Sequence, residues 1–167
     1  MTQDSKALSV TAVTAAAPAA SDVPILHVLF KVDGIDFALP ARRILQMESF
    51  TGATRVPGSP AFVTGVVQLR GRMIPVVDLR LRFGMPPAPI TPDSRVIVGE
   101  RNGRAVALLA DLARDVARIA PSQCKPPPPI VEQGAISFVE SLVQLGGRPI
   151  LILNFAKVIG EEVTHVD

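Results

Sequence analysis

FVTGVVQLRGRMIPVVDLRLRF, residues 62–83, is the stretch that decides the fold. Two runs rich in β-branched residues flank a reversal at Arg70-Gly71, a pattern typical of a β-hairpin. Pro75 lies within the second run, and because proline cannot donate a hydrogen bond to a neighbouring strand, the pattern predicts an edge strand or a bulge there. Arg70 and Arg72 have no carboxylate beside them in sequence. The hairpin is therefore expected to carry a cationic tip.

The same hairpin recurs later in the chain. Residues 62–79, FVTGVVQLRGRMIPVVDL, align with residues 138–155, FVESLVQLGGRPILILNF, with eight identities in eighteen positions. A second correspondence emerges when Gly34 is laid on Gly103, because both glycines follow a residue that accepts positive φ between two apolar runs. The repeat predicts an all-β chain of two similar units, each opening and closing on a hairpin. About five short strands per unit suit a small barrel.

Composition shifts predict the domain boundaries. Residues 1–23 are rich in Ala, Thr and Ser without a packing periodicity, so they are expected to form a disordered tail, with a short helix over Val10–Ala17 as the weaker alternative. The ordered domain is expected to span residues 24–162, followed by a tail at 163–167. Within it, the first barrel is placed at about 25–85, the second at about 93–155 and a terminal helix near 156–162.

Overall composition favours a globular protein over a nucleic-acid binder. Hydrophobic residues make up 48% of the 167 residues, which is enough to bury a core. The sequence pI is about 9.1, but the net charge is only +2, aromatic residues make up 4%, and Trp and Tyr are absent. Nucleic-acid binders usually cluster basic residues or carry stacking aromatics. A small-barrel nucleic-acid-binding protein is therefore a remote alternative.

Cysteine content and hydropathy predict a cytoplasmic location. Cys124 is the only cysteine, which excludes an internal disulfide and a cysteine-based metal site and fits a reducing compartment. No apolar run approaches the roughly 20 residues needed to cross a bilayer. The start of the chain does not resemble a signal peptide. We expect a soluble cytoplasmic protein that does not insert into the membrane.

Residues able to carry chemistry do not form a recognisable catalytic or metal site. His27 is expected to be a strand residue with a satisfied ring, and Cys124 a partly buried small residue. Asp78 and Asp111 are expected to bond backbone N–H groups at strand ends. Gly146-Gly147 lies between two strands, which is the wrong context for a phosphate-binding loop. The sequence therefore predicts a non-enzymatic protein without a metal or cofactor.

Arg70 has two interpretations from the sequence, one structural and one functional. Its counterpart in the repeat is Gly146, so the fold does not require an arginine at that turn, whereas Arg72 matches Arg148. A solvated turn charge is one interpretation of Arg70. The other is an interface residue, since arginine forks readily onto carboxylates and carbonyls.

The run from Pro57 to Phe83 closely resembles the central motif of the CheW family, the coupling proteins of bacterial chemotaxis arrays. The likeness extends over about residues 25–160 and includes the Asp-x-x-x-Asp-Val element at Asp111–Val116 and the closing LILNF. The resemblance implies two SH3-like five-stranded barrels packed around a shared core. It also implies a non-catalytic adaptor that binds the regulatory domain of the chemotaxis histidine kinase and the cytoplasmic tip of methyl-accepting chemoreceptors.

Positions matching the family motif imply a receptor-binding site. The family binds a receptor helix in a groove between the barrels, which makes Ile44 and Val116 apolar groove residues, lets Gly65 allow close approach and places Arg70 against the receptor tip. Gln46, where the family often has Glu, is included in this site. The kinase is expected to meet barrel ends, with no contact residue assigned. The protein is expected to be monomeric alone and to join receptor arrays at the inner face of the membrane.

Three departures from the family pattern affect the choice of partner. Gln46 replaces a frequent Glu, Gln68 stands where Asn commonly precedes Leu-Arg-Gly, and Ser141 occupies a frequent glycine position of the second unit. These differences leave the predicted fold unchanged. They leave open a type IV pilus pathway, or another chemosensory pathway, as the alternative to flagellar chemotaxis.

Overall fold

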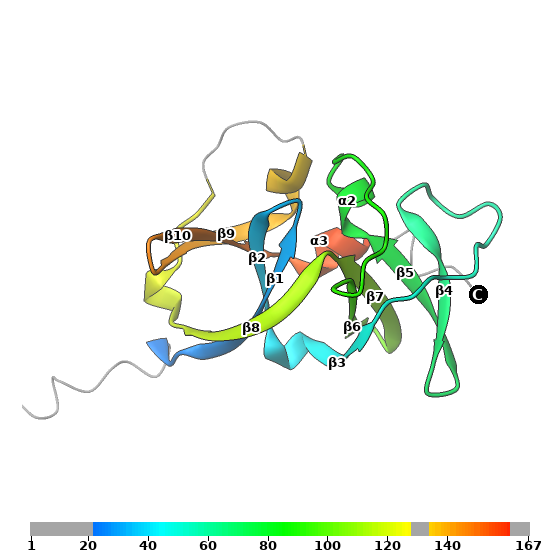
Figure 1. Cartoon of the computed structure of the whole chain (residues 1–167). Coiled ribbons are helices and arrows are strands. Elements are labelled where there is room, and N and C mark those ends of the chain that lie inside the picture. Colours follow the sequence, from blue (N-terminus) through cyan, green and yellow to red (C-terminus); the bar gives the residue numbers. More distant parts are fainter. Residues whose placement is uncertain (1–21, 128–133, 161–167) are drawn as a thin grey trace, which may run out of the picture.

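Ten β-strands form two five-stranded sheets in the computed structural model, which describes residues 22–127 and 134–160 (Figure 1). Sheet A has the order β8-β1-β2-β10-β9, with bounds β1 Ile25–Val32, β2 Ile35–Pro40, β8 Leu112–Ile119, β9 Val139–Leu145 and β10 Arg148–Leu153. Sheet B has the order β3-β6-β7-β5-β4, with bounds β3 Ile44–Ser49, β4 Val63–Leu69, β5 Arg72–Asp78, β6 Arg95–Arg101 and β7 Arg104–Ala110. Two short helices, α2 (Leu79–Arg82) and α3 (Phe155–Ile159), follow β5 and β10.

Two-residue turns with positive φ close all four hairpins of the described chain. Asp33-Gly34, Arg70-Gly71, Asn102-Gly103 and Gly146-Gly147 have first-residue φ values of 52°, 49°, 53° and 58°, and each second residue is a glycine with φ between 75° and 78°. Positive φ at both positions is the signature of the type I′ turn, whose twist matches that of the flanking strands. The hairpins predicted from the sequence are therefore confirmed.

The two barrels do not follow the predicted division of the chain. The hairpin β1–β2, expected in a first barrel at 25–85, lies in sheet A with β8, β9 and β10, while β6–β7 lies in sheet B with β3, β4 and β5. Parallel pairing joins the exchanged elements, β2 to β10 and β7 to β5. The first hairpin of each repeat thus completes the barrel of the other repeat. Local hairpin signals are the same in both repeats and do not specify which one receives the hairpin.

An isolated bridge helps to close each barrel. Thr54, in the segment after β3, pairs with Val66 of β4, and Lys125, after β8, pairs with Leu142 of β9. In both bridges the two backbone N–H groups donate to the facing carbonyl oxygens at 2.8–2.9 Å. Because these bridges connect the segments that follow the two edge strands to the opposite edges, each open sheet becomes a curled, SH3-like barrel.

Pro75 does not mark an edge strand, contrary to the sequence expectation. It lies in β5, which is paired with β4 on one side and with β7 on the other. The ladder to β7 begins at Val76, one residue after the proline, so the missing N–H interrupts no bond of that ladder. The bulge of this hairpin lies instead in β4, between Val63 and Gly65.

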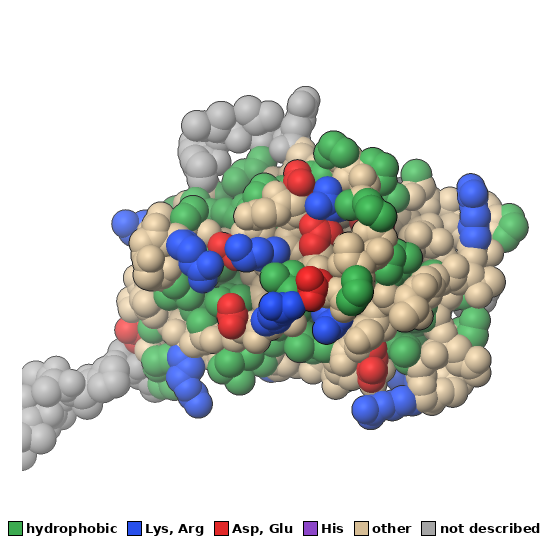
Figure 2. All heavy atoms as spheres, in the orientation of Figure 1, with side chains coloured by type: hydrophobic (Ala, Val, Ile, Leu, Met, Phe, Trp, Pro, Cys, Tyr) green, Lys and Arg blue, Asp and Glu red, His purple; other side chains and the backbone are tan. Residues whose placement is uncertain are grey.

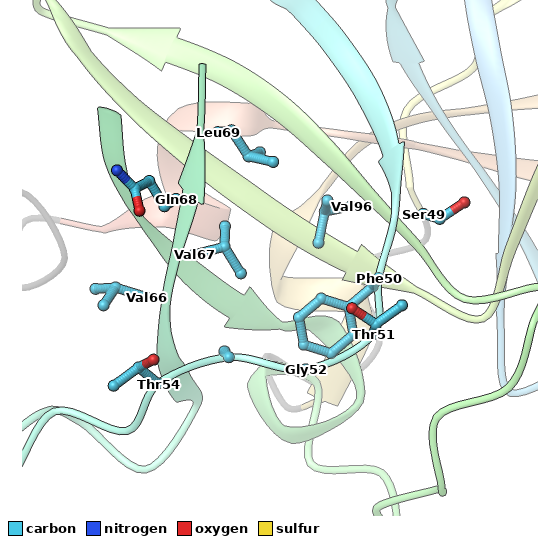
Figure 3. A pocket seen from close by; sticks show the side chains of 11 residues that line it. Ser49, Phe50, Thr51, Gly52, Thr54, Val66, Val67, Gln68, Leu69 and Val96 are labelled. Carbon is cyan, nitrogen blue, oxygen red and sulfur yellow. The ribbon is translucent and has the colours of Figure 1, made fainter. Parts of the chain in front are cut away.

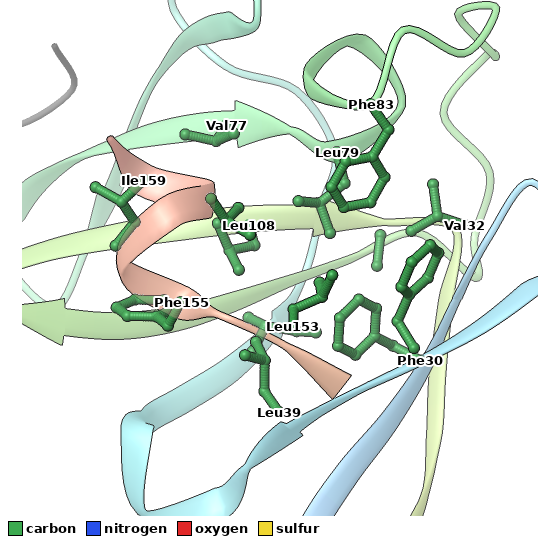
Figure 4. Close-up of a cluster of buried hydrophobic side chains, with 14 of the residues drawn as sticks. Phe30, Val32, Leu39, Val77, Leu79, Phe83, Leu108, Leu153, Phe155 and Ile159 are labelled. Atoms are coloured by element: carbon green, nitrogen blue, oxygen red, sulfur yellow. The ribbon is translucent and has the colours of Figure 1, made fainter. Parts of the chain in front are cut away.

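A shared core joins the barrels, and each barrel also has an interior of its own. In the shared core, side chains from both sheets and α3 point toward one another (Figure 4), and Phe37 has its ring centroid 5.9 Å from that of Phe30 and 5.1 Å from that of Phe83. Phe50 and Val98 belong to the interior of the sheet B barrel, and other buried residues fill the sheet A barrel. Each sheet is therefore apolar on both faces.

Matching caps begin the two short helices. The Asp78 carboxylate accepts a hydrogen bond from Arg80 N at 2.9 Å, and the Asn154 amide oxygen accepts one from Lys157 N at 3.1 Å. Both are N-caps, which satisfy backbone donors that a helix start leaves without a partner. The structural role expected for Asp78 is confirmed. The terminal helix is α3, ending at Ile159, whereas residues 1–21 and 161–167 lie outside the described chain.

We predict that Phe37→Ala destabilises both barrels together. Phe37 is fully buried in the shared core, so its truncation should cost about 3–5 kcal/mol of unfolding free energy. Urea unfolding followed by far-UV circular dichroism measures this, with Met73→Ala, at a position 62% exposed, as the control expected to change little. Separate unfolding transitions for the two barrels would contradict a shared core.

Candidate functional site

The residues first tested for chemistry have structural surroundings. His27 is buried, with Nδ1 2.9 Å from the carbonyl oxygen of Ile25 to which it donates, so the expected satisfied ring is confirmed. Cys124 is half-buried, with Sγ 3.8 Å from the carbonyl oxygen of Ala120. Within residues 22–127 and 134–160, no three His, Cys, Asp or Glu side chains are grouped so as to hold a metal ion. None of the helices in those ranges has the length and apolar character needed to cross a membrane.

Val116 lies on the edge strand of sheet A, on the face that packs against sheet B. Its cross-strand partner is Val28, and partners in a ladder share a face of the sheet. Val28 is two residues before Phe30 of the shared core, so the two side chains lie on the same face of β1. Val116 extends this face to the edge of the sheet. Val116 is nevertheless 62% exposed. It is therefore an apolar side chain at the solvent end of the contact between barrels.

Met47 is the counterpart of Val116 on sheet B. It lies on the edge strand β3 opposite Ile97, a shared-core residue that corresponds to Val28 when Gly34 is laid on Gly103. Met47 is 41% exposed. We call Met47, Val116 and the exposed Leu26, which lies on the face of Val116, the seam surface. In Figure 1, β3 and β8 run along one side of the molecule, one from each sheet. Sequence reasoning missed Met47, although the repeat alignment places it on Val116.

Ile44 and Gln46 occupy opposite faces of β3. Ile44 pairs with Gly99 and packs, half-buried, against the shared core. A bulge follows, and Gln46 pairs with Val98, whose side chain lies in the interior of the sheet B barrel. Cross-strand partners share a face, so Gln46 is on the side of β3 away from Met47. The structure brings Ile44 toward the seam surface and separates Gln46 from it.

Gly65 is buried, and a close approach within the chain explains why it is glycine. A Cβ atom at this position would lie 2.3 Å from the carbonyl oxygen of Thr54, and the φ of Gly65 is +151°. Thr54 forms the bridge that closes the barrel. The barrel closure therefore requires glycine here whether or not a partner approaches.

Arg70 is at the tip of the β4–β5 hairpin and is exposed. Its φ of 49° is in the left-handed region, which costs a non-glycine residue roughly 1 kcal/mol. Across the described residues, no side-chain hydrogen bond or ion pair involves Arg70. β4 and β3 are opposite edges of sheet B, and Val116 is in sheet A. Arg70 thus lies apart from the seam surface, as a cationic tip of its own.

Arg80 joins three segments that are distant in sequence. Its Nε donates to Asp111 Oδ1 at 3.0 Å and its Nη2 to Asp111 Oδ2 at 2.7 Å, while Nη1 lies 3.3 Å from Asp33 Oδ1 and 3.1 Å from the carbonyl oxygen of Pro86. Asp111 Oδ2 also accepts from Asp33 N at 2.8 Å, which confirms the expected backbone-bonding role of Asp111. Bidentate arginine–carboxylate pairs fix geometry as well as charge. The pair connects α2 to the point where the chain enters β8.

Arg82 connects the two repeats from the same helix. Its guanidinium carbon lies 4.1 Å from the ring centroid of Phe62 and 4.8 Å from that of Phe138, the equivalent phenylalanines of the two closing hairpins. Its Nε also donates to the carbonyl oxygen of Val158 at 2.8 Å. The guanidinium therefore stacks between the repeats and caps the end of α3. Neither Arg80 nor Arg82 was singled out from the sequence.

The pKa values of two carboxylates in this region are shifted in opposite directions. Burial would raise the pKa of Asp111, but hydrogen bonds from Arg80 and from the Asp33 backbone N–H outweigh it and hold the pKa below its usual value. Burial raises the pKa of Asp78, and its hydrogen bonds to backbone N–H groups offset this only in part. The side chain of Arg80 is 17% exposed and that of Asp111 35%. The ion pair is therefore partly shielded from solvent.

The surface around these residues mixes both signs of charge. Figure 2 shows basic and acidic side chains interleaved across the middle of the face that β8 crosses, with apolar patches among them. A separate hollow of about 440 Å³ lies at one end of the sheet B barrel, between β4 and the segment after β3 (Figure 3). Phe50, Val67, Leu69 and Val96 contribute apolar side chains to it.

Comparison with known proteins agrees with this architecture. The CheW-like domain model matches residues 26–163. The chain is 30% identical over 135 residues to the chemotaxis protein CheW of Rhizobium meliloti (strain 1021), covering 81% of this chain and 87% of that protein. It is 30% identical over 135 residues to CheW of Bacillus subtilis (strain 168), covering 81% and 86% respectively. The scaffolding protein TtCheW from Thermoanaerobacter tengcongensis matches with a TM-score of 0.76 at 28% identity, over 84% of this chain and 95% of that one, confirming the predicted fold of two SH3-like barrels.

Gly65→Ala is predicted to weaken the sheet B barrel through a backbone clash. It should lose about 1–3 kcal/mol more unfolding free energy than Gly52→Ala, because an added Cβ at Gly52 meets nothing within 4 Å. The φ of Gly52 is also positive, +142°, so the backbone strain is matched and the difference isolates the contact with Thr54. If both variants lost the same unfolding free energy in urea, the backbone at Thr54 would move away from the added Cβ without cost, and the predicted clash would be contradicted.

Asp111→Asn is predicted to change how the unfolding free energy depends on pH in the acid range. Because the folded pKa of Asp111 is lowered, its carboxylate stabilises the fold above the unfolded pKa of about 3.9, and this stabilisation is lost as the pH falls through the folded value. The raised pKa of Asp78 has the opposite effect on the pH dependence of the unfolding free energy. The contribution of Asp111 is therefore measured as the difference between wild type and the Asp111→Asn variant. We expect Asp111→Asn to be less stable by about 1–2 kcal/mol at pH 7. The difference from wild type should shrink below about pH 4.

The control for this profile is Asp115→Asn, an exposed aspartate on β8. Its urea midpoint should follow that of wild type at every pH. A constant deficit of Asp111→Asn from neutral to acid pH would contradict a charge-dependent role for Asp111.

Proposed function

Because this chain belongs to the CheW family, we propose that it is a chemotaxis adaptor, a scaffold that couples chemoreceptors to a histidine kinase without catalysing a reaction. The observation that carries this proposal is the match of the family model to residues 26–163, which includes β2 to β10 whole and all of β1 except Ile25. The charged residues Arg80 and Asp111 have structural partners: they bond each other, Arg80 also donates to the carbonyl oxygen of Pro86, and Asp111 also accepts from the backbone N–H of Asp33.

For the receptor, we propose that the cytoplasmic tip of a methyl-accepting chemoreceptor binds along the seam surface. An amphipathic helix needs an apolar strip with polar neighbours, and Met47 and Val116 are exposed apolar side chains on the two edge strands. Ile44 supports this strip from the shared core. Among the family positions, Gly65 serves the barrel closure, and Gln46 would act from the other face of β3.

Arg70 is proposed as a second receptor contact. It keeps an unfavourable φ at a turn where the other repeat has Gly146, and the hairpin already fixes its backbone, so that binding would immobilise only the side chain. Its cationic tip suits carboxylate or carbonyl groups of a receptor helix. Through the receptors, the adaptor would lie at the inner face of the membrane.

The kinase is proposed to bind at a barrel end through its regulatory domain. The hollow lined by Phe50, Val67 and Leu69 lies at such an end and has room for an apolar side chain of a partner. It lies on sheet B, apart from Val116 on sheet A, but its lining residues Ser49 and Leu69 are close in sequence to Met47 and Arg70. Receptor and kinase would therefore bind next to each other on sheet B.

We predict that Arg70→Glu weakens receptor binding without unfolding the protein. A buried interface arginine contributes about 2 kcal/mol, so the Kd for a purified receptor hairpin fragment should rise about tenfold or more, and kinase activation should fall with it. The unfolding free energy should stay within about 0.5 kcal/mol of wild type, because Arg70 is exposed. Calorimetric titration and urea unfolding measure the two quantities.

Two control variants sharpen this test. Arg70→Gly copies the turn of the other repeat, so it should lose receptor affinity while being no less stable than wild type. Arg104→Glu reverses an exposed charge beside the Asn102-Gly103 turn and should leave receptor affinity unchanged. Wild-type affinity in a folded Arg70→Glu protein would remove Arg70 from the site. If wild type retained neither the receptor fragment nor the kinase regulatory domain at micromolar concentration, the coupling function itself would be contradicted.

A further inference from the structure

The chain crosses between the sheets at two equivalent points. It passes from β2 of sheet A to β3 of sheet B through the 3-10 turn Ala41–Arg43, and from β7 of sheet B to β8 of sheet A through Asp111. Laying Gly34 on Gly103 places Arg42 on Asp111. The same alignment relates the strands that follow, β3 and β8, which carry Met47 and Val116. Whatever holds a crossover therefore positions one side of the seam surface.

The second crossover is held by an arginine fork. Arg80 binds both carboxylate oxygens of Asp111 and reaches Asp33 in the β1–β2 turn. The backbone N–H of Asp111 donates to the carbonyl oxygen of Lys31 at 3.0 Å. Helix α2, at the end of β5 in sheet B, is thus bonded to a hairpin of sheet A at the residue that precedes β8.

The first crossover has the same corner without the fork. When the closing hairpins are aligned, Ala156 takes the place of Arg80, and Asn102 takes that of Asp33. Arg42, Asn102 and Ala156 all line a pocket of about 440 Å³, which also includes Glu100, the counterpart of Lys31. This pocket therefore occupies the place at the first crossover that the Arg80 side chain occupies at the second. Among the described residues, a single bond joins this corner, from Arg101 Nη1 to the carbonyl oxygen of Ala156 at 3.0 Å, so the bidentate Arg80–Asp111 pair is an addition on one side.

We propose that Arg80 and Asp111 are positioning residues that set the angle between the two barrels and so the separation of Met47 from Val116. The shared core holds the barrels together, but apolar packing is non-directional, whereas a bidentate fork prefers one geometry. Asp111 immediately precedes β8, so a change in its position is passed to that strand. Its consequence for receptor binding rests on the proposed function, but the angle between barrels does not.

The test measures the distance between barrels directly. Gln68 on β4 and Gln144 on β9 are exposed, equivalent positions in sheets B and A, and both can be changed to cysteine in a Cys124→Ser background for spin labelling. Pulsed electron paramagnetic resonance should give one narrow distance for the parent. In Arg80→Ala we expect a broader distribution or a mean shift of about 2 Å. Asp111→Asn should behave alike, and the combined variant should add nothing, because both changes remove one contact.

Conservative and matched variants separate positioning from simple destabilisation. Arg80→Lys keeps the charge but not the fork, so it should recover only part of the parent distance. Arg114→Ala removes an exposed ion pair with Asp93 from β8 itself, and it should leave the distribution unchanged. Circular dichroism confirms that each labelled variant is folded. A folded Arg80→Ala protein with the parent distance distribution would overturn the proposal.

Receptor binding distinguishes this inference from the proposed function. If the barrels move in Arg80→Ala and the seam surface binds the receptor, the affinity for the receptor hairpin fragment should fall about fivefold or more. If the distance changes while receptor affinity stays at the wild-type value, the positioning role is supported and the receptor site is wrong.

Discussion

The shared apolar core is the constraint on which the rest of the structure depends. It is filled from both sheets, with Phe30 and Phe37 from sheet A and Phe83 following α2 from sheet B. Because the first hairpin of each repeat lies in the barrel of the other, the backbone crosses this core twice. The barrels are therefore joined by the packing of this core and by two backbone crossovers, while all strand pairing stays within one sheet or the other. A double barrel follows, with edge strands whose outward residues are available to partners.

Directional contacts are added to this non-directional core, and α2 carries most of them. Arg80 holds the chain where it enters β8, and Arg82 stacks between Phe62 and Phe138 while it caps α3. A helix of one turn has little stability of its own. Its importance comes from its place at the junction of β5, the closing hairpins and the second crossover. Two arginines, spaced so that they point to different neighbours, make that junction specific.

Local features could be predicted from the sequence, and choices between distant partners could not. The type I′ turns follow from residues such as Asp33-Gly34 and Asn102-Gly103, and the repeat follows from aligned residues. The exchange of hairpins was missed because both repeats offer nearly the same pairing pattern, and only packing of the whole chain decides between them. Gln46 was grouped with Ile44 through the family resemblance, and the bulge that places the two side chains on opposite faces of β3 is not visible in the sequence pattern. The Arg80–Asp111 pair joins residues far apart in sequence, beyond any local signal.

The exchanged hairpins also determine how this protein can be divided. The segment after Phe83, rich in proline up to Pro92, is the natural place to cut the chain into its two repeats. Each fragment would then hold three strands of one barrel and two of the other, and therefore no complete barrel. The unit that duplicated in the sequence is thus not the unit that folds, and the chain is double in ancestry but indivisible in three dimensions.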